Sequence, residues 1–288
     1  MTATPVPRAA LVPAGAVKVV PESDDHPPLL HADGFVAPVP VPGAVNTAGV
    51  EDSPFILPDG QTLYFFFTPA LDVPPEGQIL DGVTGIYASA WDGTAWSEPE
   101  RVVLQDPGKL AGDGCPFVLA DTMWFCSARE GYTGMHWYTA KFRGGTWLDW
   151  ELADFAPEHE VGELHISADG AELVFASEQP GGAGGRDIWM SRRVDGTWQT
   201  PKNVVAVNTA EFEGWPALNP SGDELWFSRN DSIWRSRREG GVWQAPEMVI
   251  GPLAGEPSVD AAGNLYFVHH YFRDGEMVEA DIYVAYRK

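Results

Sequence analysis

Carboxylates recur at one place in a repeating pattern of this sequence, where an apolar segment begins that leads into a turn rich in Asp, Gly or Ser. The members of this set are Glu51 with Asp52, Asp113, Glu163, Glu213 and Glu256. Crowded carboxylates raise one another's pKa, so that one can act as a general acid beside another that acts as a base. Oxygen ligands of this kind also suit Ca²⁺ or another divalent cation.

We select four of these acids as catalytic candidates: Glu51, Asp113, Glu213 and Glu256. Glu163 is a candidate for ligand binding. The alternative is that each acid belongs to the repeat itself and only accepts hydrogen bonds from loop amides of a neighbouring repeat. That alternative is weaker for the group than for one member, because one acid per repeat brings the set together around a shared axis.

Two adjacent histidines, His269 and His270, interrupt the repeat at the end of its last hairpin. Imidazole titrates near neutral pH, which makes both catalytic acid–base candidates, with simple packing as the alternative. His165 is a ligand-binding candidate, and together with His269 and the carboxylates it could bind a transition metal. No short-range metal motif is present, so no residue is assigned as a metal ligand.

Further ligand-binding candidates lie at equivalent hairpin ends. Arg129, Arg229 and Tyr271 follow the second strands, and Trp215 opens a segment where other repeats have Ser, Cys or Glu. An indole ring there would offer a flat surface to a sugar ring or a cation. Cys115 and Cys126 should face each other across one hairpin, either as a disulfide or as the reduced pair expected in the cytoplasm.

These residues are distributed over five similar segments. The segments span residues 53–67, 115–127, 163–177, 215–229 and 256–270. Each reads as strand, turn and strand, which is the signature of a β-hairpin. A third strand follows each hairpin, and in four repeats a segment of the form Gly-x-Trp follows that. We therefore expect an all-β protein, a five-bladed β-propeller with four antiparallel strands per blade.

The fifth repeat ends at Lys288 without its fourth strand. Residues 33–38 (DGFVAP) match the missing segment, with Phe35 in place of Trp. We expect this N-terminal strand to close the last blade and leave no unpaired sheet edge. The domains are then a Pro-rich lead over residues 1–30 and one propeller over residues 31–288. Deleting residues 1–40 should destabilise the fold, whereas deleting residues 1–25 should not.

The units resemble the PD40 repeat, the WD40-like blade of TolB-type propellers. The resemblance is carried by residues 208–213 (NTAEFE), 221–228 (SGDELWFS) and 196–201 (GTWQTP). It implies a propeller and leaves the activity open, because family members include interaction scaffolds as well as propellers fused to peptidase domains. TolB-type propellers usually have six blades, so five is a departure from the family.

The composition restricts the partners. Lys and Arg number 18 against 41 Asp and Glu, for a formal net charge of −23. Such a surface lacks the basic footprint that nucleic acids and anionic membranes require. No apolar run reaches the length of a membrane helix, and residues 1–16 make a poor signal peptide. We expect a monomer in the cytoplasm, with an extracytoplasmic location as the alternative.

The function expected from these features is binding of a small neutral or cationic molecule at an acidic channel mouth. An enzyme using carboxylate and histidine acid–base chemistry, of hydrolase, lyase or isomerase (cyclase) type, is the first hypothesis. A non-catalytic TolB/PD40-like module that binds a protein or a glycan is the second. A structural propeller that holds a divalent cation is the third.

Overall fold

The computed structural model describes residues 7–71, 73–79, 81–106, 108–129, 134–153 and 162–288. Within these ranges the regular secondary structure is almost entirely β-strand, which confirms the all-β prediction. The helical elements are short: α1 (Pro75–Gln78) and the 3₁₀ turns η1 (Arg8–Ala10) and η2 (Pro21–Ser23). None of the described helices is long and apolar enough to cross a membrane.

The strands form antiparallel runs in sequence order. The first run is β3 (Val50–Ile56), β4 (Thr62–Thr68), β5 (Gly85–Ala90) and β6 (Glu100–Arg101), and the second is β7 (Ala111–Leu119), β8 (Thr122–Arg129), β9 (His136–Arg143) and β10 (Thr146–Leu152). In the third, β11 (Leu164–Ile166), β12 (Glu172–Ser177) and β13 (Asp187–Val194) are completed by β14 (Thr197–Trp198) and β15 (Lys202–Asn203), which both pair with β13. Each run begins with a hairpin that the sequence repeats predict.

Two further runs complete the chain and recruit N-terminal strands. One is β16 (Glu213–Leu218), β17 (Glu224–Arg229), β18 (Ser232–Glu239), β19 (Val242–Trp243) and β20 (Glu247–Gly251), with β1 (Leu29–Leu30) paired to β20. The other is β21 (Ala254–Val259), β22 (Leu265–Arg273) and β23 (Glu276–Ala285), with β2 (Val39–Pro40) paired to β23. A single parallel pair, Ala280 with Val50, joins β23 to β3.

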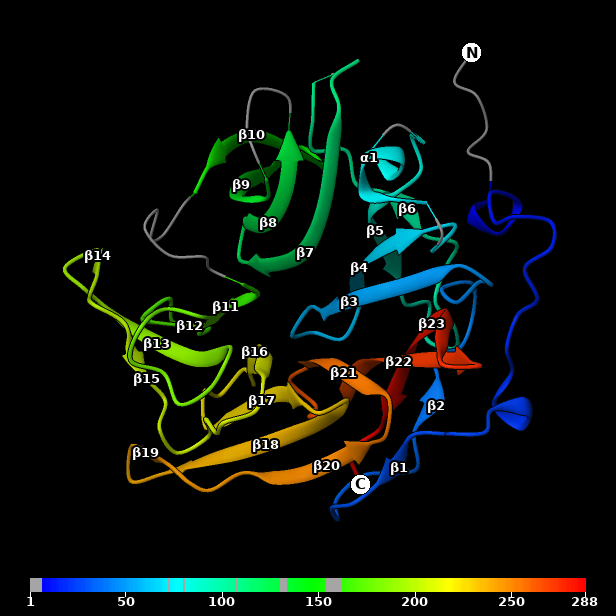
Figure 1. Cartoon of the computed structure of the whole chain (residues 1–288). Coiled ribbons are helices and arrows are strands. Elements are labelled where there is room, and N and C mark those ends of the chain that lie inside the picture. The colour runs from blue at the N-terminus through cyan, green and yellow to red at the C-terminus, as the bar shows by residue number, and fades with distance from the viewer. Residues whose placement is uncertain (1–6, 72, 80, 107, 130–133, 154–161) are drawn as a thin grey trace.

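Figure 1 shows the runs arranged around a common centre, with β3, β7, β11, β16 and β21 innermost. A strand covered on both faces must be apolar at consecutive positions rather than at alternate ones, as in the TLYFFFT sequence of β4. Aromatic residues of the second and third strands pair in register and fill the spaces between runs: Phe65 with Tyr87, Phe125 with Tyr138, Phe175 with Trp189, Phe227 with Trp234, and Phe267 with Tyr283.

A bulge interrupts the register of four innermost strands at equivalent places. The bulged residue precedes a proline in each strand and has a positive φ: 48° at Ser53, 50° at Cys115, 49° at Trp215 and 56° at Glu256. Proline has no N–H to donate to the ladder, so the pairing must break there. A bulge redirects a side chain, and here it turns the bulged residue toward the centre of the molecule.

The N-terminal segment runs along the outside of the molecule, past β23 and on to β20 (Figure 1). Phe35 makes a bridge with Arg287, and β2 continues the same pairing along β23. The strand expected over residues 33–38 therefore lies slightly later in the chain. Arg8 and Phe35 are both almost completely buried, so the segment packs into the body rather than lying loosely on it.

Candidate functional site

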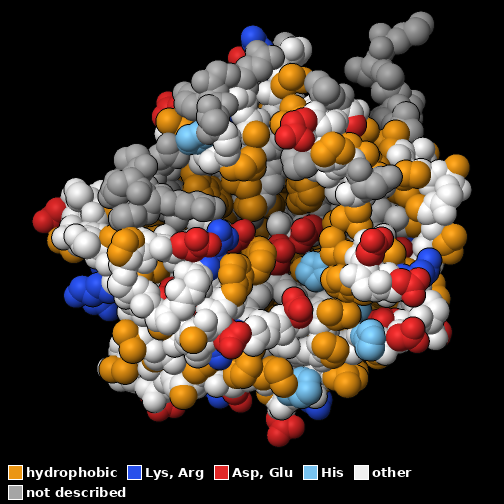
Figure 2. Space-filling model, in the orientation of Figure 1, with side chains coloured by type: hydrophobic (Ala, Val, Ile, Leu, Met, Phe, Trp, Pro, Cys, Tyr) orange, Lys and Arg blue, Asp and Glu red, His pale blue; other side chains and the backbone are white. Residues whose placement is uncertain are grey.

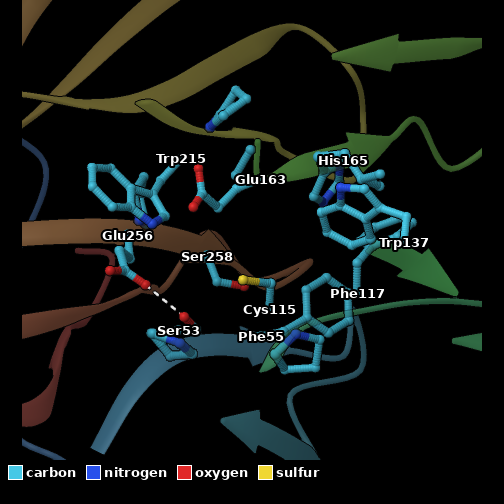
Figure 3. A pocket seen from close by; sticks show the side chains of 16 residues that line it. Ser53, Phe55, Cys115, Phe117, Trp137, Glu163, His165, Trp215, Glu256 and Ser258 are labelled. Carbon is cyan, nitrogen blue, oxygen red and sulfur yellow. Dashed lines mark hydrogen bonds between the residues drawn. The ribbon is translucent and has the colours of Figure 1, made fainter. Parts of the chain in front are cut away.

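Five side chains converge at the centre of the molecule from five different parts of the chain (Figure 3). They are Ser53, Cys115, Glu163, Trp215 and Glu256, and we call them the central ring. Four of them are the bulged residues described above. The fifth, Glu163, stands at the corresponding place before β11, where its carbonyl accepts a hydrogen bond from the Ala176 amide.

The central ring separates two adjoining cavities that share its side chains. The larger, of about 340 Å³, opens between the first two runs and is lined by apolar groups such as Phe66, Ile79 and Met135. The smaller, of about 60 Å³, shares the ring side chains and is lined beyond them by residues such as Phe55, Phe117 and His165. Figure 2 shows the hollow at the middle of this face, with acidic side chains and a histidine gathered around it. The molecule therefore has a cavity of small-molecule size whose mostly apolar wall also carries several carboxyl groups.

The smaller cavity is lined by aromatic rings and one histidine. His165 packs against Phe117 and Phe55, with ring centroids 4.6 Å and 6.1 Å away. Burial lowers the pKa of His165 to about 3, so its imidazole is neutral near pH 7. Among the described residues its Nδ1 has no hydrogen-bond partner. His165 therefore reaches the central cavity, as expected, but as an uncharged wall residue.

Asp52, Glu256 and His270 form a compact polar cluster beside the central ring. Their nearest ligand-type atoms all lie within 4.8 Å of one another. The Ser53 hydroxyl donates to Glu256 Oε2 at 2.8 Å, and the Ser53 amide donates to Asp52 Oδ1 at 2.7 Å. Burial raises the pKa of Glu256 well above its usual range, and the adjacent carboxyl group of Asp52 adds to the effect.

The remaining candidate acids are engaged by arginines. Glu51 Oε1 lies 3.0 Å from Arg8 Nη1, Asp113 Oδ1 lies 3.1 Å from Arg129 Nη2, and Glu213 Oε1 lies 2.7 Å from Arg229 Nε. All three acids are almost completely buried, and Asp113 also touches the wall of the larger cavity. Glu51 and Glu213 do not line the central cavity. These pairs hold neighbouring loops in place.

Arg8, which belongs to the N-terminal segment, makes the same kinds of contact as Arg229 makes within its own hairpin. Arg229 pairs with Glu213 and donates to the Val207 carbonyl, while Arg8 pairs with Glu51 and donates to the Val45 carbonyl. Both guanidinium groups lie over aromatic rings. Sequence reasoning missed Arg8. The available signal was Phe67, which leaves Glu51 without an arginine at the end of its own hairpin.

The two adjacent histidines point to opposite faces of β22, as successive residues of a strand must. His269 is buried, with Nε2 2.8 Å from Asp24 Oδ2 and Nδ1 donating to the Leu253 carbonyl at 3.0 Å. Tyr271 lies on the same side, 2.8 Å from the hydroxyl of Tyr283. Of the three, only His270 joins the central cluster.

The candidate residues chosen from the sequence therefore fall into two groups, those at the central cavity and those outside it. The structure brings to the central cavity or its edge Asp113, Glu163, His165, Trp215, Glu256 and His270. It leaves outside the cavity Glu51, Arg129, Glu213, Arg229, His269 and Tyr271. The five acids are not equivalent, because Glu163 and Glu256 lie two residues farther along their repeats than the other three. Glu163 and Glu256 follow a glycine, as Cys115 and Trp215 do, and that pattern could have identified the central ring.

Cys115 and Cys126 lie side by side on β7 and β8 as free thiols. Contact with the Cys126 thiol and burial raise the pKa of Cys115 well above its usual range. Of the two arrangements left open by the sequence, the structure has the reduced pair. A thiol whose pKa is raised in this way is a poor nucleophile.

No family model matches this chain, and no curated protein matches it. Several solved structures share its architecture at low identity. A gluconolactonase from Xanthomonas campestris has 14% identity and a TM-score of 0.53, over 95% of this chain and 98% of that one. A family 117 glycoside hydrolase from Zobellia galactanivorans has 13% identity and a TM-score of 0.57, over 88% and 90%.

An endo-arabinase from Bacteroides thetaiotaomicron gives a similar result, with 14% identity and a TM-score of 0.52 over 89% of this chain and 99% of that one. Similarity at this level of identity is evidence for the fold alone. Together with the radial arrangement of the strands, it shows that the chain is a β-propeller.

Proposed function

We propose that the central cavity is the active site of an enzyme that acts on a small uncharged or cationic molecule by acid–base chemistry. Glu163 is the group that exchanges a proton, Trp215 supports the substrate, and Asp52 with Glu256 supplies negative charge at the edge of the cavity. The observation that carries this proposal is the central ring: one backbone distortion turns four chemically different side chains into one cavity, where Glu163 joins them.

The backbone distortion lowers the stability of the fold, so a functional role is the simplest reason for it to be present at four places. A non-glycine residue in the left-handed region costs about 1–2 kcal/mol, and such residues cluster at functional positions. Packing alone would be served by an apolar side chain at each bulge. The chain instead has a hydroxyl group, a thiol, an indole and a carboxyl group at these positions, with a second carboxyl group at Glu163.

The charges of the cavity favour a neutral or cationic ligand. Asp52, Glu163 and Glu256 all line its wall, and the whole chain is strongly acidic. Arg186 Nη1 lies 4.0 Å from Glu163 Oε2 and favours the ionised carboxylate that a general base requires. The cavity volume of about 340 Å³ falls in the range of small-molecule sites.

Sugar-derived molecules are the first substrates to test. Trp215 gives the cavity an aromatic surface on which a sugar ring can stack. The gluconolactonase, the glycoside hydrolase and the endo-arabinase named above share the fold. Hydrolysis is therefore the leading reaction class, and lyase or isomerase chemistry would use the same carboxyl groups.

A panel of sugar lactones and aryl glycosides, followed by chromogenic assay and by thermal shift, tests this proposal. Glu163→Gln should lower kcat by about 10²–10⁴-fold and leave ligand-induced stabilisation in place. Trp215→Ala should weaken binding by about tenfold. Glu211→Gln, which changes an exposed carboxylate outside the cavity, should behave as wild type.

Two outcomes would count against an enzyme. If the Glu163→Gln variant had wild-type activity, Glu163 would not take part in the reaction. Stabilisation by a glycan or a peptide without any turnover would instead support the non-catalytic TolB/PD40-like binding module.

We also propose that the propeller has five blades and that β2 closes the last of them. The antiparallel runs that begin at β3, β7, β11, β16 and β21 support five blades. The pairing of β2 with β23 supports closure by the N-terminal strand, in a propeller formed by residues 31–288 that follows a lead over residues 1–30. The PD40-like motifs support a TolB-type relationship. A cytoplasmic monomer remains the prediction for its location and assembly.

A further inference from the structure

We propose that Asp52, Glu256 and His270 bind a divalent first-row transition-metal cation, such as Zn²⁺ or Mn²⁺, at the edge of the central cavity. The inference rests on the function proposed above, because it identifies the cofactor of the same site. The juxtaposition of two carboxylates and one imidazole carries it, since imidazole is a good ligand for these metals and a rare one for Ca²⁺ or Mg²⁺.

The three ligands come from three strands and meet without rearrangement of the backbone. Asp52 lies on β3, Glu256 on β21 and His270 on β22. Their ligand atoms lie within 4.8 Å of one another. Bonds of about 2.0–2.2 Å place ligand atoms roughly 3–4 Å apart, so small side-chain rotations suffice to close the site.

Each carboxylate is oriented by a hydrogen bond that leaves further oxygen lone pairs free. Both donors belong to Ser53, whose hydroxyl serves Glu256 Oε2 and whose amide serves Asp52 Oδ1. Such outer contacts fix metal ligands and are a regular part of metal sites. His270 lies over Gly255, where a Cβ atom would come within 3.9 Å of its Cε1, so the ring is held beside the strand that carries Glu256.

The charge of the cluster is the second observation that points to a cation. Among the described residues, neither Asp52 nor Glu256 has a Lys or Arg nitrogen within 4.0 Å, although Glu51, Asp113 and Glu213 each have an arginine at that range. Glu256 is only 8% exposed. A buried carboxylate requires an opposite charge or a proton. A divalent cation would balance both acids at once.

A cation at this place would complement the other cavity residues. The three protein ligands would leave other coordination positions of the cation open. These would face the space that Glu163 and Trp215 also line. A metal ion in such a site polarises a bound oxygen atom of substrate or water. Glu163 is then the carboxylate that is left to exchange the proton.

Metal binding to the EDTA-treated full-length protein tests this inference directly. Calorimetric titration with Zn²⁺, Mn²⁺ and Ca²⁺, with Co²⁺ absorption as the spectroscopic readout, should show about one ion per chain. Zn²⁺ and Mn²⁺ should bind at least about tenfold more tightly than Ca²⁺. Glu256→Gln and His270→Ala should each weaken binding by more than about 100-fold.

The controls distinguish a variant that no longer binds metal from a variant that no longer folds. His31→Ala removes an exposed histidine and should bind as wild type. Asp52→Asn provides a third ligand variant, and far-UV circular dichroism with melting curves shows which variants are folded. The inference is overturned if no ion binds at millimolar concentration, if Ca²⁺ binds as tightly as Zn²⁺, or if folded Glu256→Gln and His270→Ala bind as wild type.

The titration needs no substrate, so its result is independent of the proposed enzyme activity. Metal binding that depends on all three ligands, in a protein that turns over no tested compound, supports the site and weighs against the proposed reaction. Turnover that depends on Glu163, in a protein that binds no metal, supports the reaction and overturns the site.

Discussion

The φ angles of Ser53, Cys115, Trp215 and Glu256 lie between 48° and 56°, and each residue precedes a proline. These four residues have the same backbone conformation but different side chains. The backbone therefore sets where the side chain goes, and the side chain sets what the cavity can do. Substitutions at these positions should alter the site more than the fold.

His165 provides a test at the residue scale. Its pKa is about 3 in the folded protein, against about 6.5 in an unfolded chain, so the folded state disfavours the charged ring. Its contribution to stability is complete above pH 6.5 and is lost as the pH falls from 6.5 toward 3. Between pH 6.5 and pH 4 we expect the wild type to lose roughly 1–3 kcal/mol more than His165→Phe.

Urea denaturation at a series of pH values measures this difference. Acidic residues titrate in the same range, but they do so in both proteins, so the comparison isolates His165. The rings of Phe55 and Phe117 surround the site and should accept a phenylalanine. Parallel stability curves for the two proteins would contradict the assignment, and His165→Asn provides a smaller replacement if Phe does not fit.

Some site residues could be identified from the sequence and others could not. Trp215 stands out because its type differs from those at equivalent repeat positions, and Glu256 was selected as one of the recurring carboxylates. Asp52 and Cys115 were not selected, because the direction of a side chain at a bulge does not follow the simple alternation of a strand. Glu51 and Glu213 were selected for a shared position, and only the structure reveals their arginine partners.

At the scale of elements, η1 brings Arg8 to the first run of strands. Its guanidinium pairs with Glu51, donates to two backbone carbonyls and lies over Phe65 and Phe67. Removing one partner of a buried ion pair leaves an uncompensated charge and costs about 3–5 kcal/mol. We therefore expect Arg8→Met to lose about that much stability in urea denaturation.

A matched control and a double variant sharpen that test. Arg193→Met removes an exposed arginine that also lies over a tryptophan, and it should cost less than about 1 kcal/mol. Adding Glu51→Gln to Arg8→Met removes the unpaired charge and should recover part of the loss. A neutral effect of Arg8→Met alone would show that η1 does not support the first run.

The hairpins were predictable because each repeats the same order of strand, turn and strand. The attachment of the N-terminal segment was not, because residues 7–30 carry no copy of the repeat. Their contacts are individual polar pairs, such as Lys18 with Asp281 and Asp24 with His269. Pairs of this kind leave no periodic signal.

At the scale of the whole molecule, the N-terminal segment links the two ends of the chain. The sequence predicted that deleting residues 1–25 would leave stability unchanged. The buried contacts of Arg8, Lys18 and Asp24 now predict a loss for that deletion as well. Deleting residues 1–43 also removes β2 and Phe35, so it should destabilise the protein further.

Melting temperatures of the wild type and the two truncated proteins, measured by calorimetry, check this order. The expected series is wild type above the shorter deletion and the shorter deletion above the longer one. Equal melting temperatures for the two truncated proteins would mean that β2 adds nothing to the propeller, and the closure proposed above would be wrong.

The pairing of β2 with β23 also has a consequence for how this protein is made. The N-terminal segment leaves the ribosome well before its partner strands do, since Asp24 and His269 are 245 residues apart. At about 5–20 residues per second, the segment waits on the order of 10–50 s for its partner strand. The prolines at positions 7, 13, 21, 27 and 28 have no N–H to donate to a strand ladder, so we expect them to hinder pairing with other strands during that time. The same prolines make this stretch resemble an unstructured leader. In the nascent chain they would help the closing strand to stay unpaired until its partner is made.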